Sequence, residues 1–328
     1  MDLKTLIAKV NKTFGDKTIG FARELGFTSV SRMTSGSLFL DWALGQNEET
    51  KVSGWPIGRI VELYGPESAG KSLISLITIA HAQKEGKVCA YLDAEGSFDR
   101  AFAIKLGVDV DKLLFSRESG GEALIDMACE LLRSKKVDII IFDSLAAMIP
   151  KMEVEDPMEQ AQMAPVARMM SRALRKLTFL NEKTLMIFIN QLRVNPGAKY
   201  GNPEYTPGGR ALKFYASLRV DVRQGDWLLD AKDKKKKIGQ VVKFRVVKNK
   251  TTPPYREGYF KFLYKGEFDK VDELISIGIL NEKIKRKGSY FYLMGKGYQG
   301  REELEKALKD TPVLFKEAKK EVFKNGKN

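Results

Sequence analysis

Short apolar runs and helix-like stretches alternate along the middle of the chain from about residue 59. The apolar runs are rich in Ile and Val, and the stretches between them place apolar residues at helical spacing. Strand-like runs fall at 59–64, 88–93, 137–143 and 185–190, and helical stretches fall at about 71–85, 99–106, 121–135 and 165–181. Strands that are apolar throughout and alternate with helices are typical of a parallel sheet covered on both faces. The pattern therefore predicts an α/β fold with a mostly parallel central sheet flanked by helices.

The segments on either side of this core follow other patterns. Apolar residues at positions 3, 7, 10 and 14 have helical spacing, which predicts a short amphipathic helix and then a connecting segment. Residues 35–45 predict a capped helix that ends at a glycine. From about residue 269, a helix, short strands and a charged terminal helix predict a small α+β domain. We therefore expect three parts, at 1–31, 32–268 and 269–328.

Three further strand-like runs are expected to extend the sheet. They fall at 215–223, 239–248 and 258–265. Between the first two lies 230–237, which contains five lysines and two aspartates and predicts an exposed hairpin tip. A solvated charge run explains this tip better than a dedicated binding site.

Composition narrows the function more than it narrows the fold. Lys and Arg number 56 against 42 Asp and Glu, so a polyanion is a plausible partner, although solubility or the lysine-rich usage of an AT-rich genome would give the same excess. The single histidine, His81, leaves a zinc site or a histidine-based triad almost nothing to draw on, so we discard metalloproteases and serine hydrolases. Cys89 and Cys129 are expected to be small buried hydrophobes. No apolar run of about 18 residues and no signal peptide is visible, so we expect a cytoplasmic protein with no membrane partner.

A phosphate-binding motif stands between the first predicted strand and the first helix of the core. The pattern G-x-x-x-x-G-K-[S/T] is met by Gly65, Pro66, Glu67, Ser68, Ala69, Gly70, Lys71 and Ser72. The glycines let successive backbone N–H groups point inward at phosphates, and the following helix adds the positive end of its dipole. We expect Lys71 to reach the β- and γ-phosphates and the Ser72 hydroxyl to bind Mg²⁺. The motif predicts a P-loop ATPase with ATP and Mg²⁺ as cofactors.

Polar residues at the ends of three other strands are expected to complete this chemistry, because strand ends at one edge of a sheet face the same crevice. Asp143 ends an apolar run and fits the carboxylate that holds Mg²⁺ through water. Glu95 is the predicted general base, and Asp93 beside it is expected to be structural. Asn190 and Gln191 end the third strand, and Gln191 could report whether the γ-phosphate is present. The loop that follows, 192–209, is long and rich in Gly and Pro, as functional loops often are.

These motifs together resemble the bacterial RecA recombinase family. The resemblance is carried, in order, by Gly65–Ser72, Leu92–Glu95, Asp143–Ser144, Asn190–Arg193, Gly201–Glu204, Gly208–Ser217 and Val247–Lys250. Their order and spacing agree from about residue 5 to residue 300. The motifs at 201–204 and 248–250 are specific to this family rather than general to P-loop proteins. The short, lysine-rich form would suit a phage-encoded member.

The resemblance implies a RecA-type ATPase core and a helical filament of this chain on single-stranded DNA, with residues 1–31 serving subunit–subunit packing. Such a filament pairs its strand with homologous double-stranded DNA and exchanges strands. ATP would lie between neighbouring subunits, with Lys248 and Lys250 reaching the γ-phosphate of the next protomer to stabilise transition-state charge. Single-strand-binding protein and loading mediators are implied partners.

The resemblance also assigns residues around the adenine. Phe102, which follows Asp99, occupies the adenine-stacking position, and Tyr264 is the matching contact from the neighbouring subunit. Leu73 completes the set of nucleotide contacts. Lys213 and Phe214 open a helix where the family couples the nucleotide state to the neighbouring subunit.

Two loops match the DNA-binding loops of the family. The first, 155–164, is poorer in glycine than usual, and Met163 keeps the position of a methionine that touches bases. The helix after it carries three arginines on one face, which suits a phosphate track, with a solvated helix face as the alternative. These arginines are Arg168, Arg172 and Arg175. The second loop supplies Arg193, Asn195, Lys199, Tyr200, Gly208, Gly209 and Arg210.

A weaker second DNA site of the family is matched by basic residues farther along the chain. They are Arg223, Lys243 and Arg245, with Lys283, Lys285, Arg286 and Lys287 as an extension. Many members of the family end in an acidic tail that competes with DNA. The last fourteen residues here contain five lysines and two glutamates, so we expect no such inhibition and faster loading on duplex DNA than in tailed members.

The altered first loop and the basic terminus keep one alternative function open. It is a recombination mediator or regulator that binds ATP and DNA without exchanging strands. A hexameric helicase or phosphotransferase on the same core fits poorly, because the Gly201–Glu204 loop and the N-terminal helix are typical of filament formers.

Overall fold

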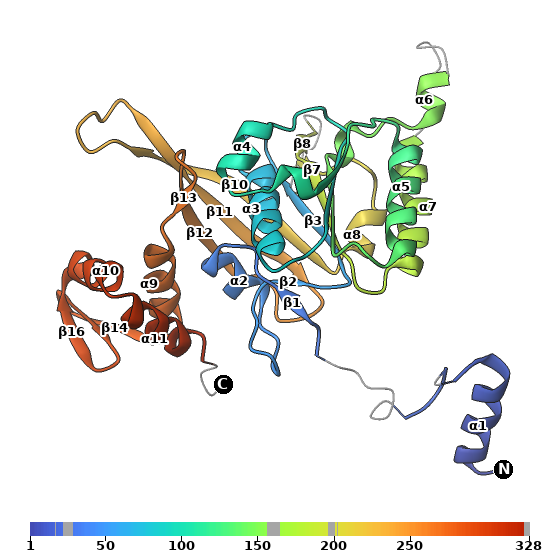
Figure 1. Cartoon of the computed structure of the whole chain (residues 1–328), viewed down its shortest axis with the longest axis horizontal. Coiled ribbons are helices and arrows are strands. Elements are labelled where there is room, and N and C mark those ends of the chain that lie inside the picture. Colours follow the sequence, from blue (N-terminus) through green and yellow to red (C-terminus); the bar gives the residue numbers. More distant parts are fainter. Residues whose placement is uncertain (17, 22–28, 156–164, 196–200, 202, 325–328) are drawn as a thin grey trace.

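The computed structural model describes residues 1–16, 18–21, 29–155, 165–195, 201 and 203–324. In this part of the chain, a sheet of nine strands forms the centre of the molecule, in the order β13-β12-β11-β10-β3-β7-β6-β4-β5 (Figure 1). The strands from β10 to β5 run parallel to their neighbours, whereas β11, β12 and β13 add an antiparallel extension. The bounds are β3 (Ile60–Gly65), β4 (Cys89–Asp93), β5 (Leu113–Ser116), β6 (Ile139–Asp143), β7 (Leu185–Gln191), β10 (Leu218–Leu229), β11 (Lys237–Asn249), β12 (Glu257–Leu263) and β13 (Glu267–Phe268). The predicted α/β fold with a mostly parallel sheet is confirmed.

Helices cover both faces of the sheet, because alternate residues of its central strands point to opposite sides. On β6, Ile139 and Ile141 pack with α2 and α3, whereas Ile140 and Phe142 pack with α5 and α7. Both faces of each central strand are therefore buried, which explains why these strands are apolar throughout. The helix bounds are α2 (Leu38–Leu44), α3 (Lys71–Lys84), α4 (Arg100–Lys105), α5 (Gly121–Ser134), α7 (Pro165–Leu180) and α8 (Ala211–Tyr215).

Several short elements connect these layers. They are β1 (Arg32–Met33), β2 (Trp55–Pro56), β8 (Arg193–Val194), β9 (Glu204–Tyr205), α6 (Lys151–Glu155) and the 3₁₀ turns at Val110–Lys112 and Leu145–Ala147. Strands β8 and β9 pair with each other at the base of the predicted second DNA loop. No helix in the described ranges is long and apolar enough to cross a membrane.

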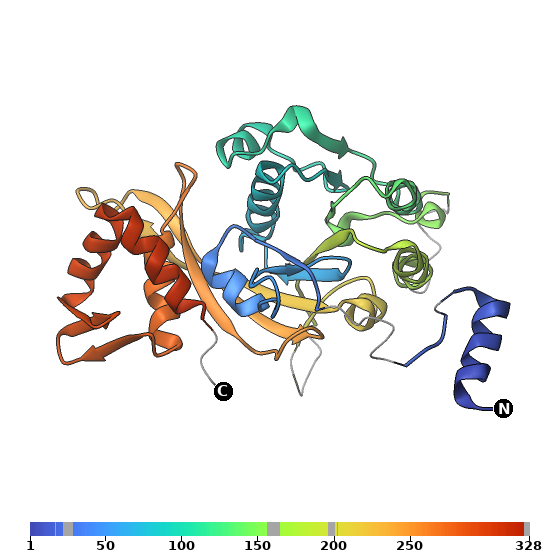
Figure 2. The ribbon, with the colours of Figure 1, turned by 60° about the horizontal axis from the view of Figure 1, so that its bottom comes forward.

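Helix α1 (Leu3–Phe14) lies apart from the rest of the chain in two views (Figures 1 and 2). Asp2 caps it by accepting a hydrogen bond from the Thr5 N–H (2.8 Å). None of its residues is buried, and Leu3 and Phe14 are 57% and 73% exposed. The predicted amphipathic helix is present, and its apolar side chains stay largely exposed.

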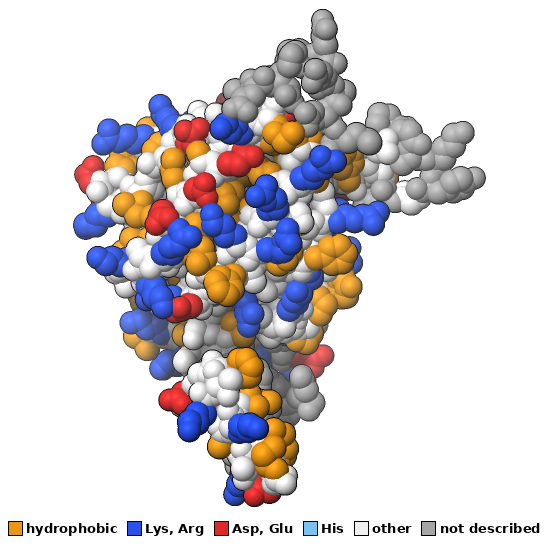
Figure 3. Space-filling model, turned by 90° about the vertical axis from the view of Figure 1, so that its right-hand side faces the viewer, with side chains coloured by type: hydrophobic (Ala, Val, Ile, Leu, Met, Phe, Trp, Pro, Cys, Tyr) orange, Lys and Arg blue, Asp and Glu red, His pale blue; other side chains and the backbone are white. Residues whose placement is uncertain are grey.

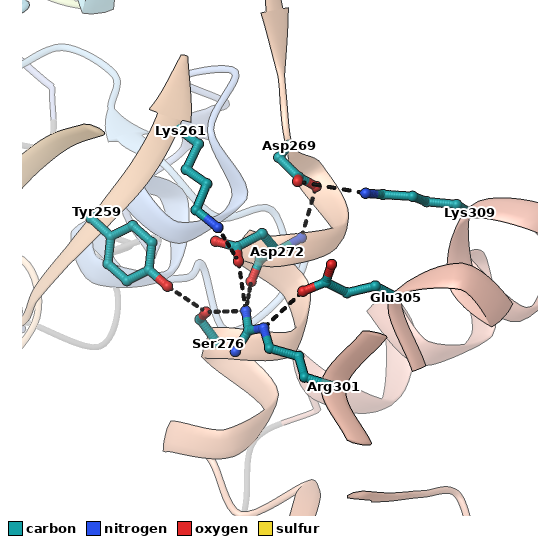
Figure 4. Close-up of polar contacts among 8 residues, drawn as sticks. All are labelled: Tyr259, Lys261, Asp269, Asp272, Ser276, Arg301, Glu305 and Lys309. Atoms are coloured by element: carbon teal, nitrogen blue, oxygen red, sulfur yellow. Dashed lines mark hydrogen bonds and ion pairs between the residues drawn. The ribbon is translucent and has the colours of Figure 1, made fainter. Parts of the chain in front are cut away.

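The C-terminal residues form helices around a separate small sheet. The elements are α9 (Lys270–Leu280), β14 (Ile284–Lys287), β15 (Tyr290–Leu293), β16 (Lys296–Gln299), α10 (Gly300–Asp310) and α11 (Pro312–Val322). Where one terminal helix was expected there are two, because Pro312 starts a new helix rather than continuing α10. Asp272 of α9 accepts from the Lys261 amine of β12 (2.8 Å) and from the Arg301 guanidinium of α10 (2.7 Å), as Figure 4 shows. This carboxylate, 1% exposed, thereby ties the C-terminal elements to the central sheet.

Candidate nucleotide site and DNA-binding surface

The predicted phosphate-binding loop connects β3 to α3 and depends on two glycines for different reasons. A Cβ on Gly65 would collide with the backbone carbonyl of Val222 on the neighbouring strand β10. Gly70 has a φ of +102°, in the left-handed region that side chains disfavour, and it starts α3. The loop can therefore turn sharply from strand to helix while it lies against β10.

Lys71 lies inside this loop. Its amine donates to the backbone carbonyls of Gly65 (3.1 Å) and Pro66 (2.5 Å). Burial lowers the pKa of this amine, and the carboxylates of Asp143 and Glu95 oppose that shift. The amine is therefore held by carbonyls of its own loop, beside the place where the motif binds phosphate oxygens.

Asp143 joins the phosphate-binding loop to the end of β6. Its Oδ2 accepts a hydrogen bond from the Ser72 hydroxyl (2.9 Å) and a short one from the Tyr91 hydroxyl. Burial raises the pKa of Asp143, and both hydrogen bonds oppose that shift. Hydroxyl and carboxylate oxygens are the ligands that Mg²⁺ prefers, and this ion usually keeps several waters and substrate phosphates as its other ligands. Ser72 and Asp143 thus fit a magnesium site, although no group of three His, Cys, Asp or Glu side chains in the described ranges forms one alone.

Glu95 and Gln191 meet at the ends of β4 and β7. The Gln191 amide donates to the Glu95 carboxylate in a long hydrogen bond of 3.4 Å. The backbone N–H of Glu95 donates to the carbonyl of Asp143 (3.2 Å), which fixes the turn beside the metal-binding carboxylate. Asp93 accepts from the backbone N–H groups of the turn that follows it, at 2.8–3.2 Å. The arrangement supports the structural role expected for Asp93 and leaves Glu95 open toward the crevice.

A pocket of about 230 Å³ adjoins the phosphate-binding loop. Phe102, Phe262 and Tyr264 line it together with Gln240 and residues 68–73, which include Leu73. Asp99 caps α4 by accepting from the Phe102 N–H (2.9 Å), which positions that ring. The structure places Tyr264 in the pocket of its own chain, where the family resemblance led us to expect it from a neighbour. Three aromatic rings in the lining suit a nucleobase.

Lys248 and Lys250 lie away from this pocket, at the end of β11. The Lys248 amine donates to the carbonyls of Lys213 (2.5 Å) and Phe214 (3.2 Å), and the Lys250 amine donates to that of Phe214 (3.1 Å). Both lysines therefore bind the C-terminal carbonyls of α8, where cations are favoured by the helix dipole. Burial and then the charge of Lys250 lower the pKa of Lys248.

Helix α7 presents its three arginines to solvent. Arg168, Arg172 and Arg175 are exposed, while its other face, including Met170 and Leu174, is buried against α5. Figure 3 views the side of the molecule that carries α5 and α7, and Lys and Arg side chains are spread across it. The predicted basic face is present on α7, which begins directly after the predicted first DNA loop in the sequence.

The structure describes only parts of the predicted DNA loops. Met163, Lys199 and Tyr200 lie outside the described residues. Arg193, Asn195 and Arg210 are exposed. Gly208 and Gly209 have φ values of +86° and +75°, and side chains there would collide with Leu145 and Ala167. These glycines thus let the loop pack closely above the 3₁₀ turn and α7.

The predicted second DNA site falls on a pocket of about 410 Å³ between β10, β11 and β12. Arg223, Lys243 and Arg245 all line it. Arg223 is already engaged, because its guanidinium bonds the Glu204 carboxylate twice (2.8 and 2.6 Å) and Asp221 as well (2.6 Å). The remaining predicted cations lie on or beside β14, in a different sheet, where Lys285, Arg286 and Lys287 are exposed and Lys283 contacts Glu321 (3.7 Å).

Comparison with known proteins decides the family. The model of the RecA N-terminal domain matches residues 1–269. The Protein RecA of Rickettsia bellii (strain OSU 85-389) is 42% identical over 319 residues, which cover 96% of this chain and 90% of that protein. The Protein RecA of Sulfurovum sp. (strain NBC37-1) is 44% identical over 324 residues, or 98% of this chain and 91% of that protein.

The chain belongs to the RecA family. Family membership confirms the predicted recombinase and ATP hydrolase, and it confirms ATP as a cofactor. It also agrees with the nine-stranded sheet of the described chain, which is of the RecA type.

Some residues of this RecA-family site were not predicted from the sequence. Tyr91 bonds Asp143, and Phe262 and Gln240 line the base pocket. A hydroxyl inside an otherwise apolar strand was the available signal for Tyr91. No such signal marks Phe262 or Gln240 in the sequence, because their place in the pocket depends on how β11 and β12 pair.

Proposed function

We propose that this RecA-family chain hydrolyses ATP with Mg²⁺ at a site completed by a neighbouring protomer, as part of a helical filament on single-stranded DNA. The filament pairs its strand with homologous double-stranded DNA and exchanges strands. One observation carries the shared site. Of the described residues that line the P-loop pocket, Lys71 is the one cation, while Lys248 and Lys250 contact α8 instead.

Each group of the P-loop side has a distinct role in this proposal. The loop N–H groups and Lys71 bind the β- and γ-phosphates, and Ser72 and Asp143 hold Mg²⁺, the latter through water. Glu95 activates the attacking water, and Gln191, which contacts Glu95, responds to the γ-phosphate. Magnesium supplies charge neutralisation on the phosphates.

The other half of the site comes from the next protomer in the filament. Lys248 and Lys250 leave the carbonyls of α8 and bind the γ-phosphate across the interface, where two cations stabilise the transition state. The exposed apolar side chains of α1 are covered by the neighbouring subunit. Because α8 directly follows the second DNA loop, the same lysines link the nucleotide bound at the site to the strength with which that loop binds DNA.

DNA binding in this proposal is largely independent of sequence. The arginines of α7 follow the phosphates of single-stranded DNA, and the loops after β6 and β7 hold its bases and backbone. The pocket on β10 and β11 receives the duplex more weakly. We also propose a cytoplasmic location, and single-strand-binding protein and loading mediators as partners.

Replacement of the proposed base tests the chemistry. Glu95→Gln keeps the shape and the contact with Gln191 but removes the proton acceptor, so turnover should fall ~10²-fold or more with ATP and DNA binding retained. The measurement is ATP hydrolysis with saturating single-stranded DNA, beside nucleotide and DNA binding. Glu85→Gln, at an exposed glutamate ending α3, is the matched control. Undiminished turnover would remove Glu95 as the base.

A strand-exchange assay separates this function from that of a mediator. Circular single-stranded and homologous linear duplex DNA are incubated with the protein and ATP. A recombinase yields joint molecules and exchanged products, whereas a mediator binds both DNAs and leaves them unexchanged.

A further inference from the structure

Strands β10 and β11 continue beyond the sheet as a two-stranded arm. Strand β12 pairs with β11 only as far as Gly239, while β10 and β11 go on pairing with each other to Leu229 and Lys237. Figure 1 shows this hairpin extending away from the helices that cover the sheet. The arm is therefore a projection whose two long sides are accessible.

The tip of the arm carries five lysines beside two aspartates. The aspartates of the turn accept backbone hydrogen bonds, with Asp230 bonding the N–H of Lys232 (2.8 Å) and Asp233 bonding that of Lys235 (3.0 Å). Among the described residues, none of the five lysines at 232 and 234–237 forms a salt bridge. The aspartates thus shape the turn, and the side chains of these lysines are exposed.

An exposed tryptophan stands at the base of this tip. Trp227 is 40% exposed, and the amine of Lys237 lies 4.0 Å from the centre of its ring. The other two tryptophans are less accessible, since Trp55 is fully buried and Trp42 is partly covered by Arg256. A large aromatic side chain left in water beside unpaired cations is typical of surfaces that bind nucleic acid by stacking and by phosphate contacts.

The charges of the tip continue those of the pocket on the same ribbon. Lys243 and Arg245 line that pocket and lie six and eight residues from Lys237 along β11. At ~3.4 Å per residue, the stretch from Lys237 to Lys243 spans roughly 20 Å. With one phosphate pair per ~3.4 Å of duplex, this corresponds to about six base pairs.

We propose that the lysine-rich arm, residues 225–238, is a binding site for the phosphate backbone of duplex DNA. It extends the pocket of Lys243 and Arg245 outward, with Trp227 packing on the DNA. The inference rests on the proposed function, because it assigns the arm to the duplex that the filament receives. The sequence alone favoured a solvated charge run, and the exposed ring of Trp227 beside lysines that form no salt bridge among the described residues changes that interpretation.

Replacement of three tip lysines tests the arm. One triple variant combines Lys232→Gln, Lys234→Gln and Lys235→Gln. The matched control replaces three exposed lysines of α10 and α11 with Gln, namely Lys306, Lys316 and Lys320. Filaments are formed on single-stranded DNA with a non-hydrolysable ATP analogue and titrated with labelled heterologous duplex at several salt concentrations. Heterologous duplex excludes any contribution from base pairing.

The two triples should differ clearly. The tip triple should bind duplex ~10-fold more weakly and reduce the slope of log affinity against log salt by about 2–3, because up to three phosphate contacts are lost. The control should change affinity by less than about 2-fold, since it loses the same net charge elsewhere. An equal fall in both triples, or an unchanged salt slope in the tip triple, would overturn the proposal. So would a tip triple that assembles poorly but binds duplex normally, because the arm would then contact a neighbouring subunit.

Tryptophan fluorescence supplies a second measurement. Adding duplex to filaments should quench the emission of the wild-type protein, and Trp227→Phe should lose most of that quenching because the remaining tryptophans are shielded. Equal quenching in both proteins would place the DNA elsewhere. ATP hydrolysis with single-stranded DNA is recorded in every sample. If the wild-type protein lacks it, the proposed function fails; if it is normal and duplex binding ignores the tip, only the assignment of the arm fails.

Discussion

Individual carboxylates hold the nucleotide site in place without taking part in its chemistry. Asp93 is 1% exposed and accepts three backbone N–H bonds from the turn after β4. Glu95 lies in that turn, so the direction of the proposed base is set by its buried neighbour. Glu62, which is fully buried, accepts instead from the side chains of Asn190 (3.0 Å) and Arg219 (2.5 Å), and this fixes the end of β7 beside Gln191. Buried charges of this kind need such partners to offset their lost hydration.

A different buried acid, Glu273 of α9, should make stability depend on pH. Its Oε2 accepts from the Ser37 hydroxyl (2.6 Å) and the Phe39 N–H (2.8 Å), and burial raises its pKa to about 7. Asp41 raises this pKa further and Lys270 opposes it. The folded protein therefore binds the proton more tightly than the unfolded chain, so stabilisation is complete at low pH and is lost as pH rises toward 7.

Glu273→Gln should remove this dependence. Between pH 4.5 and 8, the variant should gain up to about 3 kcal/mol in unfolding free energy relative to the wild-type protein, mostly by pH 7. Denaturant titrations at several pH values measure the difference, with the exposed Glu302→Gln as control. Parallel curves for Glu273→Gln and the wild-type protein would contradict a proton bound at this carboxylate.

The site could be predicted from the sequence as far as its residues lie in contiguous motifs. Asp143 and Ser72 meet as expected, because each follows directly from a strand end or a loop of known geometry. Tyr264 lies in its own chain's pocket rather than in a neighbour's, and the ion pair of Arg223 with Glu204 was not foreseen. Both depend on the register of distant strands, which a local pattern does not contain.

At the scale of elements, the alternation of apolar strands and helices was sufficient to predict the core. Strands β3, β4, β6 and β7 and helices α3, α5 and α7 all fall where the pattern placed them, to within a few residues. Strand β5 was missed, because it is four residues long and lies at the sheet edge with Leu114 and Phe115 exposed. Strand β10 runs six residues past its predicted end at 223, because irregularities after Gln224 interrupt the alternation that marks a strand.

The contact between α9, α10 and β12 should respond to the loss of Arg301. Its guanidinium bonds Asp272 and Glu305 (Figure 4), so Arg301→Gln leaves the buried Asp272 with Lys261 as its remaining cation. Breaking a buried pair in this way should lower the unfolding free energy by roughly 2–3 kcal/mol.

Lys309→Gln is the control for this change. Lys309 contacts Asp269 at 3.7 Å on an exposed surface, which should contribute less than about 1 kcal/mol. Denaturant unfolding measures both variants, and limited proteolysis reports whether residues 264–270 become cleavable. Equal, small effects would mean that apolar packing alone holds the C-terminal elements.

At the scale of the whole molecule, several features are incomplete within a single chain. Helix α1 lies away from the core with its apolar side chains largely exposed, and the lysines at the end of β11 contact α8 instead of the P-loop pocket. A head-to-tail assembly would cover α1 and bring the lysines to a P-loop pocket. In such an assembly each chain meets its two neighbours through two different surfaces. Such heterologous contacts produce open helical filaments when the rotation does not close.

Mixing two inactive variants tests whether the site is shared. Glu95→Gln lacks the proposed base but keeps its lysines, whereas a chain with Lys248→Ala and Lys250→Ala keeps Glu95. Each alone should hydrolyse ATP at least ~10²-fold more slowly than the wild-type protein. In equal mixture, about a quarter of head-to-tail interfaces join the intact side of one variant to the intact side of the other, so about a quarter of the wild-type rate should return. Co-sedimentation on single-stranded DNA checks that both variants enter the filament. If both are present and no activity returns, the lysines act within their own chain, since no single chain in the mixture then holds both intact halves.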